Sequence, residues 1–277
     1  MEPGSPDRHT GTVTDLELGQ QMADVADAIT SRYFGSASLA VETKSDGSPV
    51  TAADREVEET LSRLLAEHRP DDGVLGEEVG GSGPRHRYWI LDGVDGTHNF
   101  AAGRSEWGTL IAMVDEGEVT LGIVTSPALR RRWWAARGEG AWTAETSGEG
   151  GGLPGRLVCS SSDSLDDAVV PLMPPAEHCE GWRRKVAKRL ERGTVRPTAF
   201  GHSAVRVAAG EVDAAVHLAG GPWDIAAGVV IVEEAGGRFA DLWGGRRLDT
   251  RSAVYTNSHL FDAVLTGAAA DRPSSPT

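Results

Sequence analysis

The sequence is poor in cysteine and has no long hydrophobic run. Its two cysteines, Cys159 and Cys179, form neither a CxxC pair nor a disulfide framework, so we expect reduced thiols in a cytoplasmic protein. The longest uncharged apolar stretch, Ile225–Val232, is far shorter than the roughly 20 residues that span a bilayer. The chain opens with no basic segment followed by an apolar one, so we expect no signal peptide. These absences exclude secreted proteins, membrane proteins and membrane partners.

Positive charge is also scarce. The chain has 27 lysines and arginines against 41 aspartates and glutamates, a formal net charge of −14. Such a protein repels phosphate backbones, so we expect no nucleic-acid partner. If it handles a phosphorylated metabolite, it must cancel charge locally, and a bound cation does this best. With 39% hydrophobic residues in 277, the chain can form one large domain or two small ones.

Hydrophobic periodicity predicts a mixture of helices and strands. Helical spacing runs over Val13–Phe34 and again from Thr51, where Thr51-Ala-Ala-Asp54 resembles a capping box, up to Pro70. Further helices are expected at Arg183–Arg192, Ser203–Ala209, Trp223–Ala235 and His259–Leu265. Strands are expected at Tyr88–Leu91, Trp107–Val114, Val119–Thr125, Arg132–Ala136, Leu157–Ser160, Ala214–Leu218, Arg238–Ala240 and Ala253–Thr256. The turn signal Glu116-Gly117 favours an antiparallel meander between Trp107 and Ala136.

A Gly-rich segment, Thr143–Arg156, divides the chain and is expected to be a linker. Residues 13–143 would then form an N-terminal α+β half that binds metal and phosphate. Residues 157–266 would form a C-terminal α/β half that completes the active site. Residues 1–12 and the Pro- and Ser-rich residues 268–277 are expected to be flexible tails.

Acidic residues stand at the ends of expected elements in three separate places. Gly76-Glu77-Glu78 follows an apolar pair, Asp92-Gly-Val-Asp95-Gly-Thr97 follows the strand that ends at Leu91, and Trp223-Asp224 begins an apolar helix. Each has an ordinary explanation when taken singly. Asp-Gly pairs form turns, and an aspartate at a helix N-terminus is favoured by the helix dipole. The combination of the three is what indicates a functional site.

The middle segment carries the most specific signal. Asp92 and Asp95, three residues apart in a Gly-rich turn, can aim both carboxylates at one point, and the Val94 carbonyl can face the same way. Ligands that are all oxygen suit a hard cation such as Mg²⁺ rather than zinc. Gly96 leaves room for close backbone approach, and Thr97 would begin a short helix whose N–H groups and hydroxyl can hold phosphate oxygens.

Taken together, these segments resemble the inositol monophosphatase family. Trp89-Ile-Leu-Asp92-Gly-Val-Asp95-Gly-Thr97-His-Asn99-Phe100 is similar to the family's signature, and Gly76-Glu77-Glu78 to its metal-binding glutamate motif. Gly47-Ser-Pro-Val-Thr51-Ala-Ala-Asp54 is similar to its first helix entry, and Trp223–Gly228 with Glu234–Gly237 to its C-terminal signature. The resemblance covers residues 16–266 and implies an αβαβα layered sandwich, a fold of the α/β (α+β) class. It also implies Mg²⁺-dependent hydrolysis, by metal-activated water, of a small phosphomonoester: an inositol, sugar, nucleoside or amino-alcohol monophosphate.

The resemblance implies roles for individual residues as well. Two or three Mg²⁺ ions would be held by Glu77, Asp92, the Val94 carbonyl, Asp95 and Asp224. The residues implied in catalysis are Thr97, which would orient the attacking water, Asp54, which would accept the Thr97 hydroxyl proton, and Glu77. Phosphate would bind at Asp95, Gly96 and Thr97, and the rest of the substrate at His202, Ser203 and His217.

Three residues depart from the family's pattern. Gly93 stands where proline is usual between the two aspartates, which is expected to make the loop less rigid. His217 stands where the family usually has an acid that touches the substrate, and His202 where histidinol phosphatases usually have an aspartate. Histidines suit a hydroxyl or a base better than an ammonium group, and we expect them to titrate near pH 6 to 7. We therefore predict that histidinol phosphate is a poor substrate, although burial in the core would also explain either histidine.

Other functions remain open at this point. Residues Val124–Trp142 look most like the histidinol-phosphatase branch, so a histidinol-phosphate phosphatase is one alternative. A nucleotide 3′-phosphatase, from a related family with similar motifs, is another. A third, of a different class, is a non-catalytic metal- or phosphate-binding protein, for which Gly93 is the single hint. The family's habit implies a homodimer.

Overall fold

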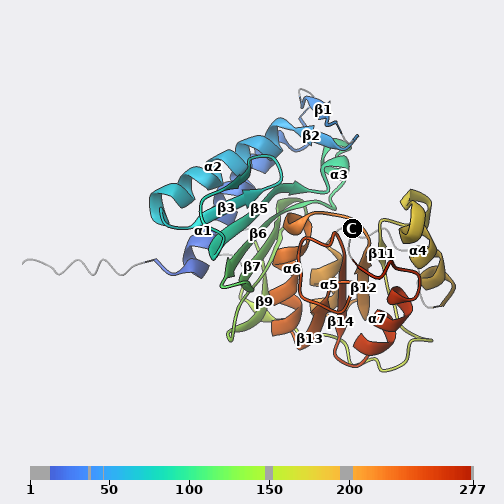
Figure 1. Ribbon diagram of the computed structural model, residues 1–277. Coiled ribbons are helices and arrows are strands. Elements are labelled where there is room, and N and C mark those ends of the chain that lie inside the picture. Colours follow the sequence, from blue (N-terminus) through green and yellow to red (C-terminus); the bar gives the residue numbers. More distant parts are fainter. Residues whose placement is uncertain (1–12, 37–38, 46, 147–151, 194–201, 276–277) are drawn as a thin grey trace, which may run out of the picture.

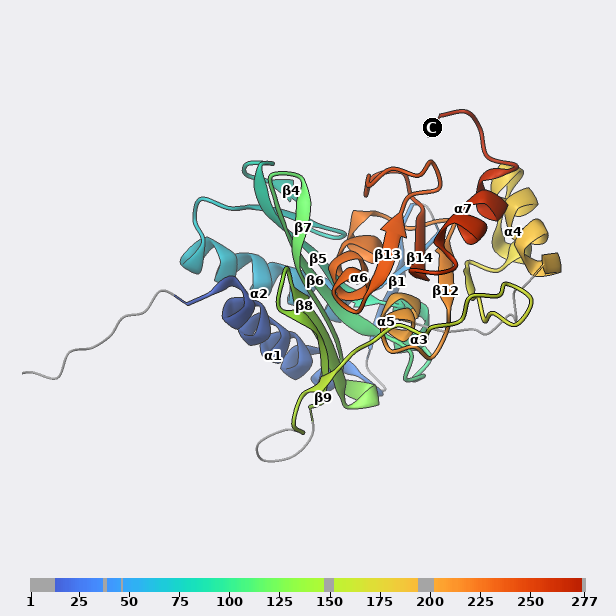
Figure 2. The ribbon, with the colours of Figure 1, turned by 90° about the horizontal axis from the view of Figure 1, so that it is seen from below.

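The computed structural model describes residues 13–36, 39–45, 47–146, 152–193 and 202–275. Five layers are stacked in the order helices, sheet, helices, sheet, helices (Figures 1 and 2). This arrangement confirms the predicted αβαβα sandwich. In the part of the chain that is described, no helix is both long and apolar enough to cross a membrane.

An eight-stranded sheet forms the second layer, and all its strands come from residues 73–156. In spatial order they are β10 (Gly155–Arg156), β9 (Gly140–Glu145), β8 (Arg131–Ala136), β7 (Glu118–Ser126), β6 (Gly108–Asp115), β5 (Arg87–Asp95), β3 (Gly73–Gly76) and β4 (Gly80–Ser82). Within the described part of this sheet, β3 and β5 pair in parallel and the other neighbouring strands pair antiparallel. The predicted meander is confirmed as β6, β7 and β8. Glu116 and Gly117, which connect β6 to β7, both have positive φ, 48° and 86°, as a two-residue hairpin turn requires.

Helices α1 (Asp15–Tyr33) and α2 (Ala52–His68) cover the outer face of this sheet. The predicted capping box of α2 is confirmed, because the Thr51 N–H donates to Asp54 Oδ2 at 2.9 Å. Side chains of β5 alternate between the two faces of the sheet: Trp89 packs under α1 and α2, whereas Ile90 packs on the opposite side.

The middle layer consists of α5 (Ser203–Ala208) and α6 (Pro222–Glu234). Helix α6 is buried without interruption from Ile225 to Val232. It is apolar on all sides because it lies between two sheets, which explains the uncharged run in the sequence. The first turn of α6, Pro222–Asp224, is half-buried at the start of this central helix.

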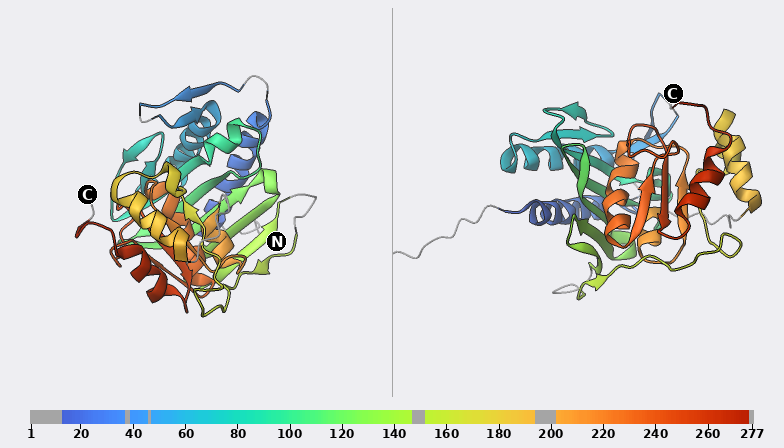
Figure 3. Two further views of the ribbon diagram at one scale, coloured as in Figure 1. Left: turned by 90° about the vertical axis from the view of Figure 1, so that its right-hand side faces the viewer. Right: turned by 60° about the horizontal axis from the view of Figure 1, so that its bottom comes forward.

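A four-stranded sheet and two outer helices complete the sandwich. The strands, in spatial order, are β11 (Leu172–Met173), β12 (Ala214–His217), β14 (Ala253–Asn257) and β13 (Gly237–Ala240). Helices α4 (Gly181–Gly193) and α7 (Phe261–Ala269) cover the outer side of this sheet, in yellow and red in Figure 3. The remaining short elements are the β1 (Val41–Thr43) and β2 (Pro49–Thr51) hairpin, α3 (Thr97–Ala101), and 3₁₀ turns at Pro127–Leu129 and Ala176–His178.

The structure differs from two expectations about the chain's organisation. Leu157–Ser160 is not a strand: the Cys159 N–H donates to the Ala235 carbonyl at 3.0 Å, so the chain leaves the sheet edge here, and the short strand β10 lies inside the expected linker. The tail expected from residue 268 starts inside α7, where Ala268 is buried, and Trp243 Nε1 donates to the Pro273 carbonyl at 3.0 Å. Residues 1–12, 147–151 and 276–277 lie outside the described part.

Candidate active site

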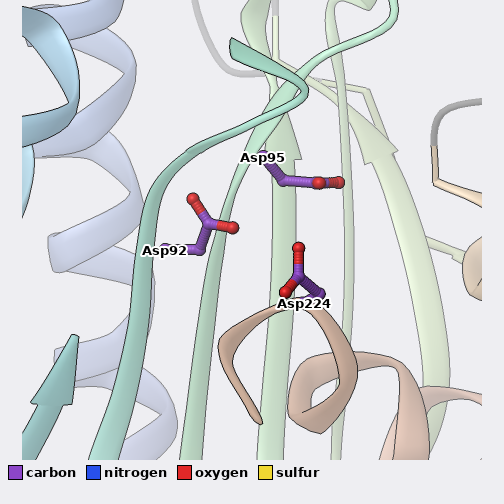
Figure 4. Close-up of side chains that lie close together, drawn as sticks. All are labelled: Asp92, Asp95 and Asp224. Atoms are coloured by element: carbon purple, nitrogen blue, oxygen red, sulfur yellow. The ribbon is translucent and has the colours of Figure 1, made fainter. Parts of the chain in front are cut away.

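Three aspartates from two distant parts of the sequence meet between the sheets. Asp92 and Asp95 lie at the end of β5, and Asp224 lies in the first turn of α6. Their carboxylates point toward one another in Figure 4, and one ligand oxygen from each lies within 4.8 Å of the others. The sequence reasoning therefore brought together three residues that the fold also brings together.

Local structure explains why these carboxylates converge. The pairing of β5 with β6 shifts register between Asp92 and Asp95, so the strand is irregular where the two aspartates occur. Asp224 is the third residue of α6, and its Oδ2 accepts a hydrogen bond from the Gly221 N–H, which fixes the carboxylate at the helix start.

The cluster is short of positive charge. Asp92 is 2% exposed, and its Oδ2 has no hydrogen-bond partner among the described residues. Burial, followed by the nearby carboxylates, raises the pKa of Asp92 well above its usual value, and burial first raises the pKa of Asp95 to about 6 and of Asp224 to about 7. A donor set made only of oxygens, with one buried oxygen unpartnered, fits a hard cation such as Mg²⁺.

Glu77 lies near this cluster, but its carboxylate forms a salt bridge with Lys44. Lys44, from the segment that joins β1 to β2, donates to Glu77 Oε1 at 2.7 Å and also pairs with Glu78. Burial alone would lower the pKa of Lys44, but the two glutamates outweigh it and raise that pKa. Glu77 is not part of the group of oxygens that meet within 4.8 Å, so its role as a metal ligand stays a prediction.

Thr97 lies between two acceptors. Its Oγ1 is 3.0 Å from Asp54 Oδ1 and 3.0 Å from the carbonyl of Val94. The other Asp54 oxygen accepts hydrogen bonds from Thr51, and burial raises the pKa of Asp54. Gly96, which precedes Thr97, has a φ of 83°, and a Cβ there would lie 2.9 Å from the Glu106 carbonyl, so the turn favours glycine.

Sequence reasoning did not single out Glu58. Glu58 is fully buried on α2, and burial raises the pKa of its carboxyl to about 7. Its Oε2 accepts from the N–H groups of Glu78 at 2.8 Å and Val79 at 3.0 Å, and its Oε1 from that of Gly93 at 3.3 Å. The signal was present in the spacing, because Glu58 lies four residues after Asp54, on the inner face of the helix.

Gly93 is tightly packed. A Cβ on this residue would lie 2.4 Å from the carbonyl oxygen of Asp54, so the backbone of β5 touches the first turn of α2. The Gly93 N–H donates a hydrogen bond to Glu58 Oε1. The loop that was expected to lose rigidity without proline is held by these two contacts.

A cavity of about 1120 Å³ opens beside Asp95 and Asp224, and His202, Ser203 and His217 all line it. His202 Nδ1 is 3.9 Å from Asp95 Oδ2. His217 Nε2 is 2.5 Å from Ser203 Oγ. Burial lowers the pKa of both histidines to about 4, so the expected titration near pH 6 to 7 is wrong and both rings are neutral at physiological pH.

Comparisons with known proteins agree with this geometry. The sequence profile described as the inositol monophosphatase family matches residues 11–273. The chain is 42% identical to the histidinol-phosphatase of Mycobacterium tuberculosis, over 91% of this chain and 96% of that protein. It is 32% identical to an inositol-1-monophosphatase of Mesorhizobium japonicum, over 90% of this chain and 94% of that one. The solved IMPase of Thermotoga maritima is 30% identical, with a TM-score of 0.76 over 91% of this chain and 96% of that structure.

Proposed function

The chain belongs to the inositol monophosphatase family and is a phosphatase of that family, and we propose that it hydrolyses a small-molecule phosphomonoester with Mg²⁺ as its cofactor. The products would be the free alcohol and inorganic phosphate. The phosphatases among its relatives act as phosphoric monoester hydrolases, and the complete set of Asp92, Asp95, Thr97 and Asp224 argues against a protein that only binds metal or phosphate.

The observation that carries the proposal is the cluster of Asp92, Asp95 and Asp224. Burial and nearby carboxylates raise the pKa of all three acids, so a bound cation would supply the counter-charge that favours their ionised forms, and their oxygens are the ligands that Mg²⁺ prefers. Glu77 and the Val94 carbonyl would complete the ligand set for two or three ions. When bound, the cations would lower the pKa of a water and neutralise charge on the phosphoryl oxygens.

The protein's own groups would orient the attacking water and hold the phosphate. The Thr97 hydroxyl can donate its hydrogen to Asp54 Oδ1, at 3.0 Å, which leaves its lone pairs to accept a hydrogen bond from water. Burial raises the pKa of Asp54 and so strengthens it as the acceptor of the Thr97 proton. Asp95 and the N–H groups of Gly96 and Thr97 would line the phosphate position.

The substrate class follows from the cavity wall. Close to the cluster, this wall carries the neutral side chains of His202 and of the Ser203–His217 pair. Neutral imidazole and hydroxyl groups exchange hydrogen bonds with hydroxyls, so we infer that a polyol, sugar or nucleoside monophosphate is preferred.

A second candidate substrate is histidinol phosphate. It is favoured by the relative named histidinol-phosphatase and by Glu177 and Glu191, which line the same cavity and could meet an ammonium group. The two candidates differ in the charge they need from the protein, so one assay separates them.

That assay measures phosphate release by the full chain from inositol, sugar, nucleoside 3′- and histidinol monophosphates. Each is tested with Mg²⁺ and with EDTA, and Asp224→Asn serves as the matched variant. We expect release only with Mg²⁺, loss of turnover in Asp224→Asn, and the highest kcat/KM for a hydroxyl-bearing substrate. Hydrolysis in EDTA would contradict the cofactor, and absence of release from every substrate would contradict the proposed function.

A further inference from the structure

Helix α2 presents two buried carboxylates, one turn apart, to the loops of the active site. Asp54 reaches the Thr97 hydroxyl, as described above. The Glu58 carboxylate accepts hydrogen bonds from three backbone N–H groups in the described part of the chain, those of Glu78, Val79 and Gly93. The first two follow Glu77, and the third lies between Asp92 and Asp95.

We propose that Glu58 is a positioning residue that fixes the distance between the loop bearing Glu77 and the strand end bearing Asp92 and Asp95. The inference rests on the proposed function, since those residues are its metal ligands. It adds a residue that touches neither metal nor substrate but determines how closely the ligands can assemble.

Packing around Glu58 supports this role. A Cβ on Gly76 would lie 2.3 Å from Glu58 Oε2, so the loop after β3 can approach the carboxylate only because residue 76 is glycine. Gly93 approaches α2 in the same way, with its own hypothetical Cβ 2.4 Å from the Asp54 carbonyl. Two glycines thus allow two loops to close on one buried carboxylate from different sides.

The chemistry of the contact makes Glu58 difficult to replace. Burying a carboxylate is costly unless hydrogen bonds satisfy it, and here three amides do so. Glutamine has the same shape but only one acceptor oxygen. In either orientation of the amide, the Gly93 N–H or the pair from Glu78 and Val79 would face an NH₂ group.

This geometry makes different predictions for two cations. Mg²⁺ requires near-ideal octahedral coordination, whereas Ca²⁺ accepts irregular and larger shells. If Glu58 acts by fixing ligand spacing, its loss weakens Mg²⁺ binding more than Ca²⁺ binding. If it contributed only a negative charge, or only stability, the two affinities would change together.

The test is calorimetric titration of the metal-free full chain with Mg²⁺ and, separately, with Ca²⁺. Glu58→Gln is compared with wild type and with Glu59→Gln, an exposed residue on the same helix. We expect Glu58→Gln to weaken Mg²⁺ binding by roughly 10- to 100-fold, as loss of ligand-orienting partners does elsewhere. We expect a smaller effect on Ca²⁺ and none in Glu59→Gln. Unchanged affinities, or equal changes for both cations, would overturn the proposal.

Three further outcomes are informative. If Glu58→Gln does not fold, hydrogen–deuterium exchange of the wild-type chain replaces it: slow exchange at Glu78, Val79 and Gly93 is expected, and fast exchange there would overturn the contact itself. If wild type binds neither cation, the proposed function fails together with this inference. If wild type binds Mg²⁺ and Glu58→Gln binds it equally well, only this inference fails.

Discussion

Replacing Asp92 with asparagine is expected to abolish turnover while stabilising the metal-free protein. The substitution preserves shape, and Asp92 Oδ2 has no hydrogen-bond partner to lose among the described residues. It removes the charge of a carboxylate that has one oxygen within 4.8 Å of an oxygen of Asp95 and of an oxygen of Asp224. At an effective dielectric constant of about 20, two unit charges at that separation repel by about 3.5 kcal/mol. Each ionised neighbour therefore adds up to that amount to the stability gained, and the gain grows with pH as the neighbours ionise.

Saturating Mg²⁺ is expected to make wild type more stable than Asp92→Asn, the reverse of their order in EDTA. A cation that binds only the folded state at 100 times its dissociation constant adds about 2.7 kcal/mol of stability. In a chain of this size that corresponds to roughly 5–10 °C in Tm. Wild type should show this shift, whereas Asp92→Asn, with one ligand neutralised, should show little or none.

The assay is thermal unfolding of both proteins at pH 8 in EDTA and in saturating Mg²⁺, together with kcat on the best substrate. A Tm of Asp92→Asn in EDTA well below that of wild type would mean that Asp92 is structural rather than a repelled ligand. A full Mg²⁺ shift in the variant, or more than about a tenth of wild-type kcat, would refute the metal assignment.

Three other outcomes are expected. Thr97→Ala should lower kcat far more than it raises KM, because orientation of the water matters most in the transition state; a change in KM alone would leave Thr97 a binding role only. Burial lowers the pKa of His217 from 6.5 to about 4. This shift contributes stability above pH 6.5, about 3 kcal/mol in total, that is lost as pH falls through 4. Urea unfolding should therefore be less pH-dependent in His217→Gln than in wild type. Histidinol phosphate should be a poor substrate, and His217→Glu should raise its kcat/KM by roughly ten- to a hundredfold, the effect of one charge-assisted hydrogen bond; a wild-type preference for histidinol phosphate would contradict this.

The parts of the fold that the sequence predicted are those with long periodic patterns. Helix α2 has an apolar stripe and a capping box, and β6 and β7 are long enough to show strand character. Strands β1, β3, β4, β10 and β11 have two to four residues each, which leaves little room for a period to show, and they were not predicted. Strands β12 and β13, with four residues each, were predicted nonetheless. The strand expected at Leu157–Ser160 failed because the chain leaves the sheet after Leu157, which still bonds to Ala141 of β9. The Cys159 N–H donates instead to the carbonyl of Ala235, at the C-terminus of α6, a tertiary contact that no local pattern encodes.

The residues of the candidate site likewise divide into those that the sequence predicted and those that it missed. Asp92, Asp95 and Asp224 occur in motifs, so the sequence was sufficient to group them. Glu58 was missed because its partners are backbone amides, which leave no signature in side-chain identity. The state of the histidines was misjudged because their pKa values depend on burial, which the sequence does not report for an isolated His202 or His217.

The position of α6 has a consequence for how the protein is made. Residues 73–156 are synthesised first and contain every strand of the large sheet, yet the inner face of that sheet, including Leu110 and Val124, is covered by α6. Until α6 leaves the ribosome, that face lacks the helix that packs along β6 and β7, and the site has two of its three aspartates. The event that buries this apolar surface is the same event that delivers Asp224, so a nascent chain completes its aspartate cluster and gains its protection from aggregation together.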